Sequence, residues 1–205
     1  MKNYLFITSL LFVIAACSNK KEKNEHKNIQ EKSSIDSTLI NTKNDLKGLR
    51  EFSLKNYELD ITIMIPEKYY TDNDDLPRFI PPEIIHNNGE ARWEIKMPGD
   101  KYWHLVIEDM TGEKTSISKE KEIHSFTGIF DYVYYIEDAT QLLYSRILKS
   151  ENSTLNSKEI KKLPNYHFFC NRTINSYNIV FSSFEMKQFR KLTVNKMLVS
   201  ANNSF

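Results

Sequence analysis

Pairs of adjacent acids are the residues of this sequence that come nearest to catalytic chemistry. Glu108-Asp109 and Glu137-Asp138 each follow a run rich in alternating apolar residues. Two neighbouring carboxylates can divide the roles of general acid and general base, as they do in glycoside hydrolysis. Adjacent acids at strand ends also occur for solvation alone, so a hydrolase that uses Asp109 or Glu137 is the alternative hypothesis.

Histidine and cysteine side chains are scattered. The five histidines show no metal-ligand spacing, and the chain has no Walker loop, GxGxxG, GxSxG, HExxH or paired CxxC motif. His167 and Cys170 lie three residues apart on an expected strand and should point to opposite faces, so we interpret Cys170 as a buried free thiol. His104 lies on the polar side of another expected strand and is predicted to be a surface or interface histidine. We therefore predict no catalytic residue, no metal site and no cofactor, and we favour a non-enzyme.

The start of the chain indicates a different chemistry. Lys2 gives a positive start, and residues 4–16 then contain no charge. This run is shorter than the roughly 20 apolar residues that cross a bilayer and has the length of a signal-peptide core. The sequence Ile14-Ala15-Ala16-Cys17 resembles the lipobox of bacterial lipoproteins, which is an aliphatic residue, two small residues and a cysteine. The resemblance implies a signal peptide over residues 1–16 and a diacylglyceryl group on the Cys17 thiol.

The same resemblance implies that the protein is located in the bacterial cell envelope. Bacterial lipoproteins are usually also acylated at the new amino terminus, and two or more acyl chains make a stable anchor, so we expect membrane attachment through the lipid on Cys17. In that family an aspartate after the cysteine commonly signals retention in the inner membrane. Ser18 stands at this position, which favours the outer membrane.

Composition divides the rest of the chain into a linker and a globular part. Residues 18–47 contain no aromatic residue and mix lysines with acids and asparagines, so we expect residues 17–47 to form a flexible, lipid-anchored linker. Residues 48–205 are long enough to bury a single core. The formal net charge of +1 argues against a nucleic-acid partner.

Apolar residues of the globular part mostly alternate, which is the period of half-buried strands. We expect seven strands, over residues 57–65, 91–97, 102–109, 129–136, 141–148, 166–174 and 177–184. Pro98-Gly99 and Asn175-Ser176 have the turn chemistry of two hairpins. The segment 129–136 also fits a helical spacing, but its aromatic and β-branched residues favour a strand.

Two helices complete the expected α+β domain, a mostly antiparallel sheet with packed helices. The first covers residues 115–126, with Ser116 or Ser118 as its cap and Gly128 at its end. The second covers residues 186–201. A strand over 177–184 that runs into such a helix is similar in element order to the PsbP-like α/β/α sandwich, over about the last hundred residues.

Residues 66–88 contain four prolines and no clear period, so we expect a long loop over one edge of the sheet. Tyr69, Tyr70, Phe79 and Ile80 lie in it. Aromatic residues displayed on a long loop can contact a partner, whereas the same residues could instead fold back as a lid over the core. The leading hypothesis is a membrane-anchored binding or accessory module with an envelope protein as its partner.

Overall fold

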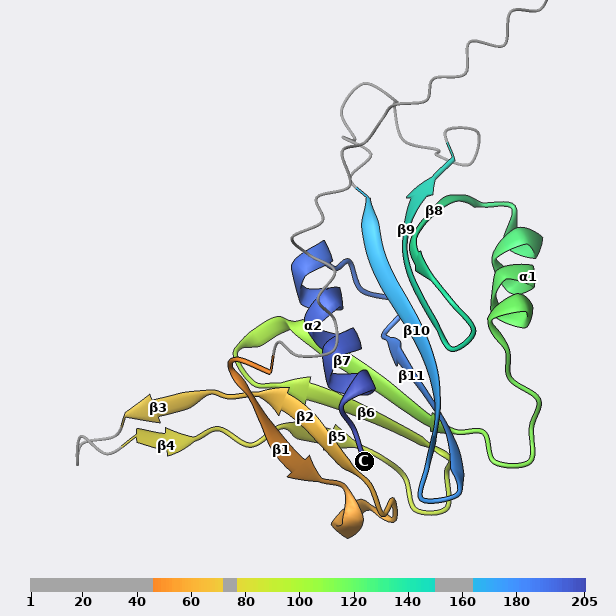
Figure 1. Ribbon diagram of the computed structural model, residues 1–205. Helices are drawn as coiled ribbons and strands as arrows, with labels where there is room; N and C mark the ends of the chain where they lie inside the picture. The colour runs from red at the N-terminus through yellow and green to blue at the C-terminus, as the bar shows by residue number, and fades with distance from the viewer. Residues whose placement is uncertain (1–45, 72–76, 150–163) are drawn as a thin grey trace, which may run out of the picture. The chain divides into compact units, whose positions relative to one another are not determined.

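A seven-stranded antiparallel sheet is the centre of the fold, in a computed structural model that describes residues 46–71, 77–149 and 164–205 (Figure 1). The strands are, in order across the sheet, β5 (Glu83–Ile85), β6 (Arg92–Met97), β7 (Asp100–Asp109), β11 (Tyr177–Ser183), β10 (Asn165–Ile174), β9 (Gln141–Leu148) and β8 (Phe130–Glu137). Two helices accompany it, α1 (Ile117–Thr127) and α2 (Lys191–Asn202). The expected α+β class is confirmed, and the segment 129–136 is a strand.

The two helices cover opposite faces of this sheet. Phe168 and Cys170 of β10 are buried in the main core with residues of α2. Phe169, which lies between them, packs in a smaller cluster with Ile117 of α1. Because successive side chains of a strand point to opposite faces, α1 and α2 must lie on different sides of the sheet.

A two-stranded sheet of β1 (Leu49–Ser53) and β2 (Thr62–Pro66) adds its side chains to the main core. The expected strand over 57–65 is wrong in extent, because a 3-10 turn covers Lys55–Tyr57 and Glu58 has a φ of 65°. Regular pairing starts only at Thr62, which also exchanges two backbone hydrogen bonds with Phe205. This strand does not enter the seven-stranded sheet, which includes the short strand β5 instead.

The expected long loop over 66–88 is also wrong, because the segment contains three short strands. β3 (Tyr69–Thr71) and β4 (Pro77–Phe79) pair with each other, and β5 pairs with β6 at the edge of the main sheet. Pro77 is the first residue of β4, a position that tolerates a residue without an N–H. β3 and β4 form an arm that extends away from the seven-stranded sheet (Figure 1).

The predicted turns are confirmed. Pro98 and Gly99 alone connect β6 to β7, and Gly99 has a φ of 69°, which glycine adopts without strain. Asn175 and Ser176 connect β10 to β11, both with positive φ. Helix α1 begins after Ser116, whose hydroxyl accepts the Lys119 N–H.

The second helix begins later than expected. It starts at Lys191, and Met186 lies before it with 85% of its surface exposed. Met197 and Ala201 of this helix are buried in the main core, and Phe189 joins the core from the segment before the helix. The predicted signal peptide, Cys17 and almost all of the linker lie outside the described residues. No helix within the described ranges is long and apolar enough to cross a membrane.

Candidate functional site

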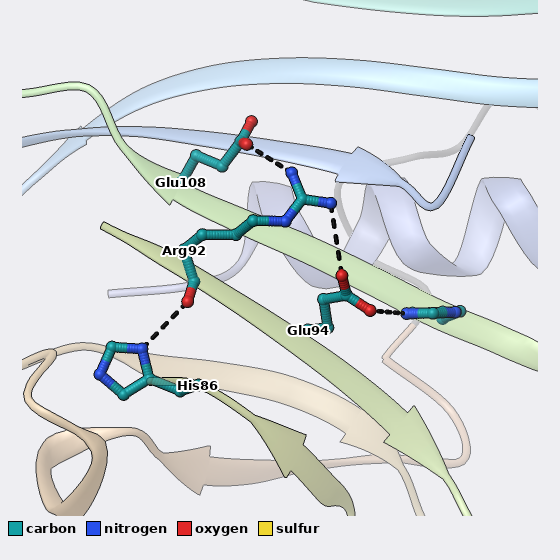
Figure 2. Close-up of polar contacts among 5 residues, drawn as sticks. His86, Arg92, Glu94 and Glu108 are labelled. Carbon is teal, nitrogen blue, oxygen red and sulfur yellow. Dashed lines mark hydrogen bonds and ion pairs between the residues drawn. The ribbon is translucent and has the colours of Figure 1, made fainter. Parts of the chain in front are cut away.

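A network of charged side chains lies on the face of β6 and β7 that points away from the main core. Trp93 and Ile95 of β6 point into that core, so Arg92 and Glu94 must point the other way. The antiparallel register places Arg92 opposite Glu108 of β7. Figure 2 shows the Arg92 guanidinium between the carboxylates of Glu94 and Glu108.

Arg92 donates to both carboxylates, and Glu94 extends the network to His104. Arg92 Nη1 lies 2.6 Å from Glu108 Oε1, and Nη2 lies 3.4 Å from Glu94 Oε1. The second oxygen of Glu94 lies 2.8 Å from His104 Nε2. One guanidinium thus fixes two carboxylates, one of which orients an imidazole.

His104 is buried, so its predicted place at the surface is wrong. Only 2% of its surface is exposed, because Phe184 stacks on the ring at 4.2 Å between centroids. Burial lowers the pKa of His104, and the charges of Lys187 and Lys96 lower it further, while the hydrogen bond with Glu94 opposes the shift. The neutral ring is therefore favoured, with Nε2 as the donor to Glu94.

The sequence carried one signal for this network that we did not use. Arg92, Glu94 and Lys96 alternate with the buried residues of β6, which marks a polar face. The pairing with His104 and Glu108 follows only from the register of the β6–β7 hairpin. Since both carboxylates are already engaged with Arg92 or His104, the network suits a rigid, charged surface better than a general base.

A second histidine, His86, packs against β6. Its ring stacks on the Trp93 ring at 4.6 Å between centroids, and its Nδ1 lies 3.0 Å from the Arg92 carbonyl oxygen (Figure 2). Its Nε2 lies 3.3 Å from Glu58 Oε2. Hydrogen bonds from the Gly89 N–H and from His86 lower the pKa of Glu58. These contacts tie the connection between β5 and β6 to the turn that precedes β2.

The two acid pairs that we singled out do not come together. β11, β10 and β9 lie between β7 and β8, which carry them. Asp109 accepts the Thr111 N–H, and Glu137 pairs with Lys121 at 2.6 Å. Burial opposes a low pKa at Asp138, but hydrogen bonds from Thr140 and Gln141 outweigh it and lower the pKa.

Cys170 is a buried free thiol, as predicted. Burial raises its pKa to about 12, which leaves the thiol protonated. His167 is 1% exposed, and burial lowers its pKa to about 3. Cys170 Sγ contacts Asn202, whereas His167 Nδ1 lies 2.9 Å from Ser183 Oγ, so the two side chains make separate contacts.

The four predicted contact residues lie on or beside the arm of β3 and β4, where they divide into two pairs. Tyr69 and Tyr70 of β3 are 50% and 48% exposed. Phe79 is half-buried under the Arg50 guanidinium, which lies 3.7 Å from the centroid of its ring. Ile80 is half-buried at the base of the arm, where its N–H donates to the Lys68 carbonyl. Phe79 and Ile80 therefore anchor an arm on which the tyrosines are displayed rather than folded onto the core.

Within the described ranges, no three histidine, cysteine or acidic side chains gather in a way that could hold a metal ion. The lipoprotein and PsbP-like resemblances stay predictions after comparison with known proteins. No family model, curated protein or solved structure matches this chain.

Proposed function

We propose that this protein is a lipid-anchored module of the bacterial cell envelope that binds a partner protein through the arm of β3 and β4. The observation that carries the proposal is the display of Tyr69 and Tyr70 on an arm anchored at its base. A side chain that is half exposed on a paired strand is already held in place before binding. Little further conformational entropy is therefore lost when a partner covers it.

The chemistry of the arm is that of a protein interface. Tyrosine and arginine are enriched in such surfaces, where a ring supplies a large contact area and a polar tip. Arg50 lies over Phe79, which pairs with Tyr69, and Arg78 lies opposite Tyr70 in the β3–β4 pair. A few aromatic and arginine side chains of this kind commonly supply most of the binding free energy of an interface.

The proposed location in the cell envelope depends on the lipobox-like residues, which imply an acylated Cys17. Replacing Cys17 by Ala should abolish labelling with a fatty acid and release the protein from the membrane fraction. Labelling and retention that are unchanged in this variant would contradict the anchor without touching the binding proposal.

Site-specific photocrosslinking in intact cells tests the binding proposal. A benzophenone amino acid placed at Tyr70 should capture one discrete protein, identified by mass spectrometry. The matched control is the same amino acid at Phe126, an aromatic residue of α1 that is 80% exposed. The identified partner should bind the Tyr69→Ser, Tyr70→Ser double variant at least about tenfold more weakly, as expected for two interface tyrosines.

Two results would contradict the proposal. Crosslinking from position 70 could yield the same products as crosslinking from position 126, which would mean that the arm has no partner of its own. The captured protein could also bind the double variant with unchanged affinity, which would mean that the tyrosines do not take part in binding.

A further inference from the structure

A recess of about 460 Å³ lies beside the turn between β6 and β7. That turn forms one wall, and the segment between β11 and α2 supplies Lys187 to the other. Both backbone groups of Lys187 are hydrogen-bonded, since its N–H donates to the Phe184 carbonyl and Asn165 Nδ2 donates to its carbonyl. The volume falls within the range of small-molecule sites, and the walls are set by backbone contacts.

Apolar and aromatic groups form much of the recess. Met97 and Trp103 are buried side chains that line it, and the more exposed Pro98 and Tyr102 line it as well. The indole Nε1–H of Trp103 is buried and has no acceptor among the residues that the structure describes. An apolar recess with a few polar groups is typical of sites for small organic ligands.

The lining of the recess contains two acids and two lysines, and the cations Lys68 and Arg190 lie next to it without lining it. Glu83 is balanced by Lys96 at 3.9 Å, and Asp100 by Lys68 at 3.5 Å. Lys187 has no carboxylate partner in the described part of the chain. The Arg190 guanidinium adds a second cation 5.5 Å from the centroid of the Tyr102 ring.

We propose that this recess binds a small organic anion with an apolar body, such as an aromatic carboxylate or phosphate ester. The apolar body lies against Met97 and Trp103, and the anionic group faces Lys187. A charge-assisted hydrogen bond between a lysine and a carboxylate or phosphate is about twice as strong as one between neutral groups, so Lys187 supplies the selectivity for anions. None of the residues that line the recess belongs to β3 or β4.

Isothermal titration of the full-length protein with phenyl phosphate tests this site. Two control ligands separate the parts of the proposal, since inorganic phosphate has the charge without the ring and benzyl alcohol has the ring without the charge. Phenyl phosphate should bind more tightly than either control. The Lys187→Gln variant should bind it about tenfold more weakly, as loss of one charged partner predicts. The control variant Lys191→Gln, whose Nζ lies over the Tyr135 ring instead, should bind it as the unmodified protein does.

Fluorescence gives a second measurement that reports on the recess itself. The chain contains two tryptophans, so the Trp93→Phe variant leaves Trp103 as the sole indole reporter. Phenyl phosphate should change its emission with the same affinity as in the titration. The proposal is overturned if phenyl phosphate shows no saturable binding to the unmodified protein, if benzyl alcohol binds as tightly, or if Lys187→Gln leaves the affinity unchanged.

Discussion

The buried imidazole of His167 makes the stability of this domain sensitive to acid. The ring is enclosed between β10 and its neighbours, with Nδ1 at Ser183 Oγ and no hydrogen-bond partner for Nε2 among the described residues. Burial is the main cause that lowers its pKa to about 3 from the usual 6.5, and the charges of Arg146 and His124 act in the same direction. The folded domain therefore keeps this ring neutral at pH values where the unfolded chain takes up a proton.

The sign and size of the effect follow from linkage. Because the pKa is lower in the folded state, the unfolded state binds more protons below pH 6.5, and the free energy of unfolding falls as the pH falls through the window from 6.5 towards 3. Each pH unit inside the window lowers the free energy of unfolding by about 1.4 kcal/mol. Between pH 7 and pH 5, His167 alone lowers the free energy of unfolding by about 2 kcal/mol. This value is nearly the same for any pKa of the folded state below about 4.

Urea unfolding at pH 7 and pH 5 measures this loss when the protein is compared with the His167→Gln variant. Glutamine cannot take up a proton in this range but can still hydrogen-bond to Ser183. All other titrating groups are common to both proteins, so their contributions cancel in the difference. The unmodified protein should lose about 2 kcal/mol more than the variant between the two pH values. Equal losses would refute the reasoning, because they would mean that His167 is protonated as easily in the folded state as in the unfolded chain.

Three further predictions concern other contacts of the domain. Glu94→Gln removes the charged partner of His104, so the pKa of that histidine should fall further in an NMR titration; a rise would contradict the role assigned to Glu94. Cys170 should not react with a thiol reagent at pH 8 until urea unfolds the domain, because burial keeps the thiol protonated, and rapid reaction of the native protein would count against this. Ser116→Ala removes the cap of α1 and should lower the free energy of unfolding by about 1 kcal/mol, whereas Ser118→Ala, the other expected cap, should have a smaller effect.

The hairpin turns and the first helix could be predicted from short-range sequence patterns. The turns at Pro98-Gly99 and Asn175-Ser176 and the end of α1 at Gly128 each depend on residues a few positions apart, so the sequence predicts them directly. The strand β9 follows its expected bounds for the same reason.

Features that depend on distant pairing could not be predicted. β5 has three residues and becomes a strand only through its contact with β6. The arm likewise depends on the pairing of β3 with β4 across residues that show no period. His104 looked like a surface residue because the ring that covers it, Phe184, follows β11 some eighty residues later in the chain. The alternation of polar and apolar residues along a strand shows which face of the sheet a side chain lies on. It does not show which other residues cover that face.

Accessibility of the arm in its natural setting tests the central claim most directly. Hydroxyl-radical labelling of intact cell envelopes and of the purified protein would compare the oxidation rates of Tyr69, Tyr70 and Phe126, which all have large exposed surfaces in the free domain. If a partner covers the arm, both tyrosines should be protected in the envelope while Phe126 is oxidised equally in both samples. Tyrosines that are oxidised as fast in the envelope as in the purified protein would contradict the account.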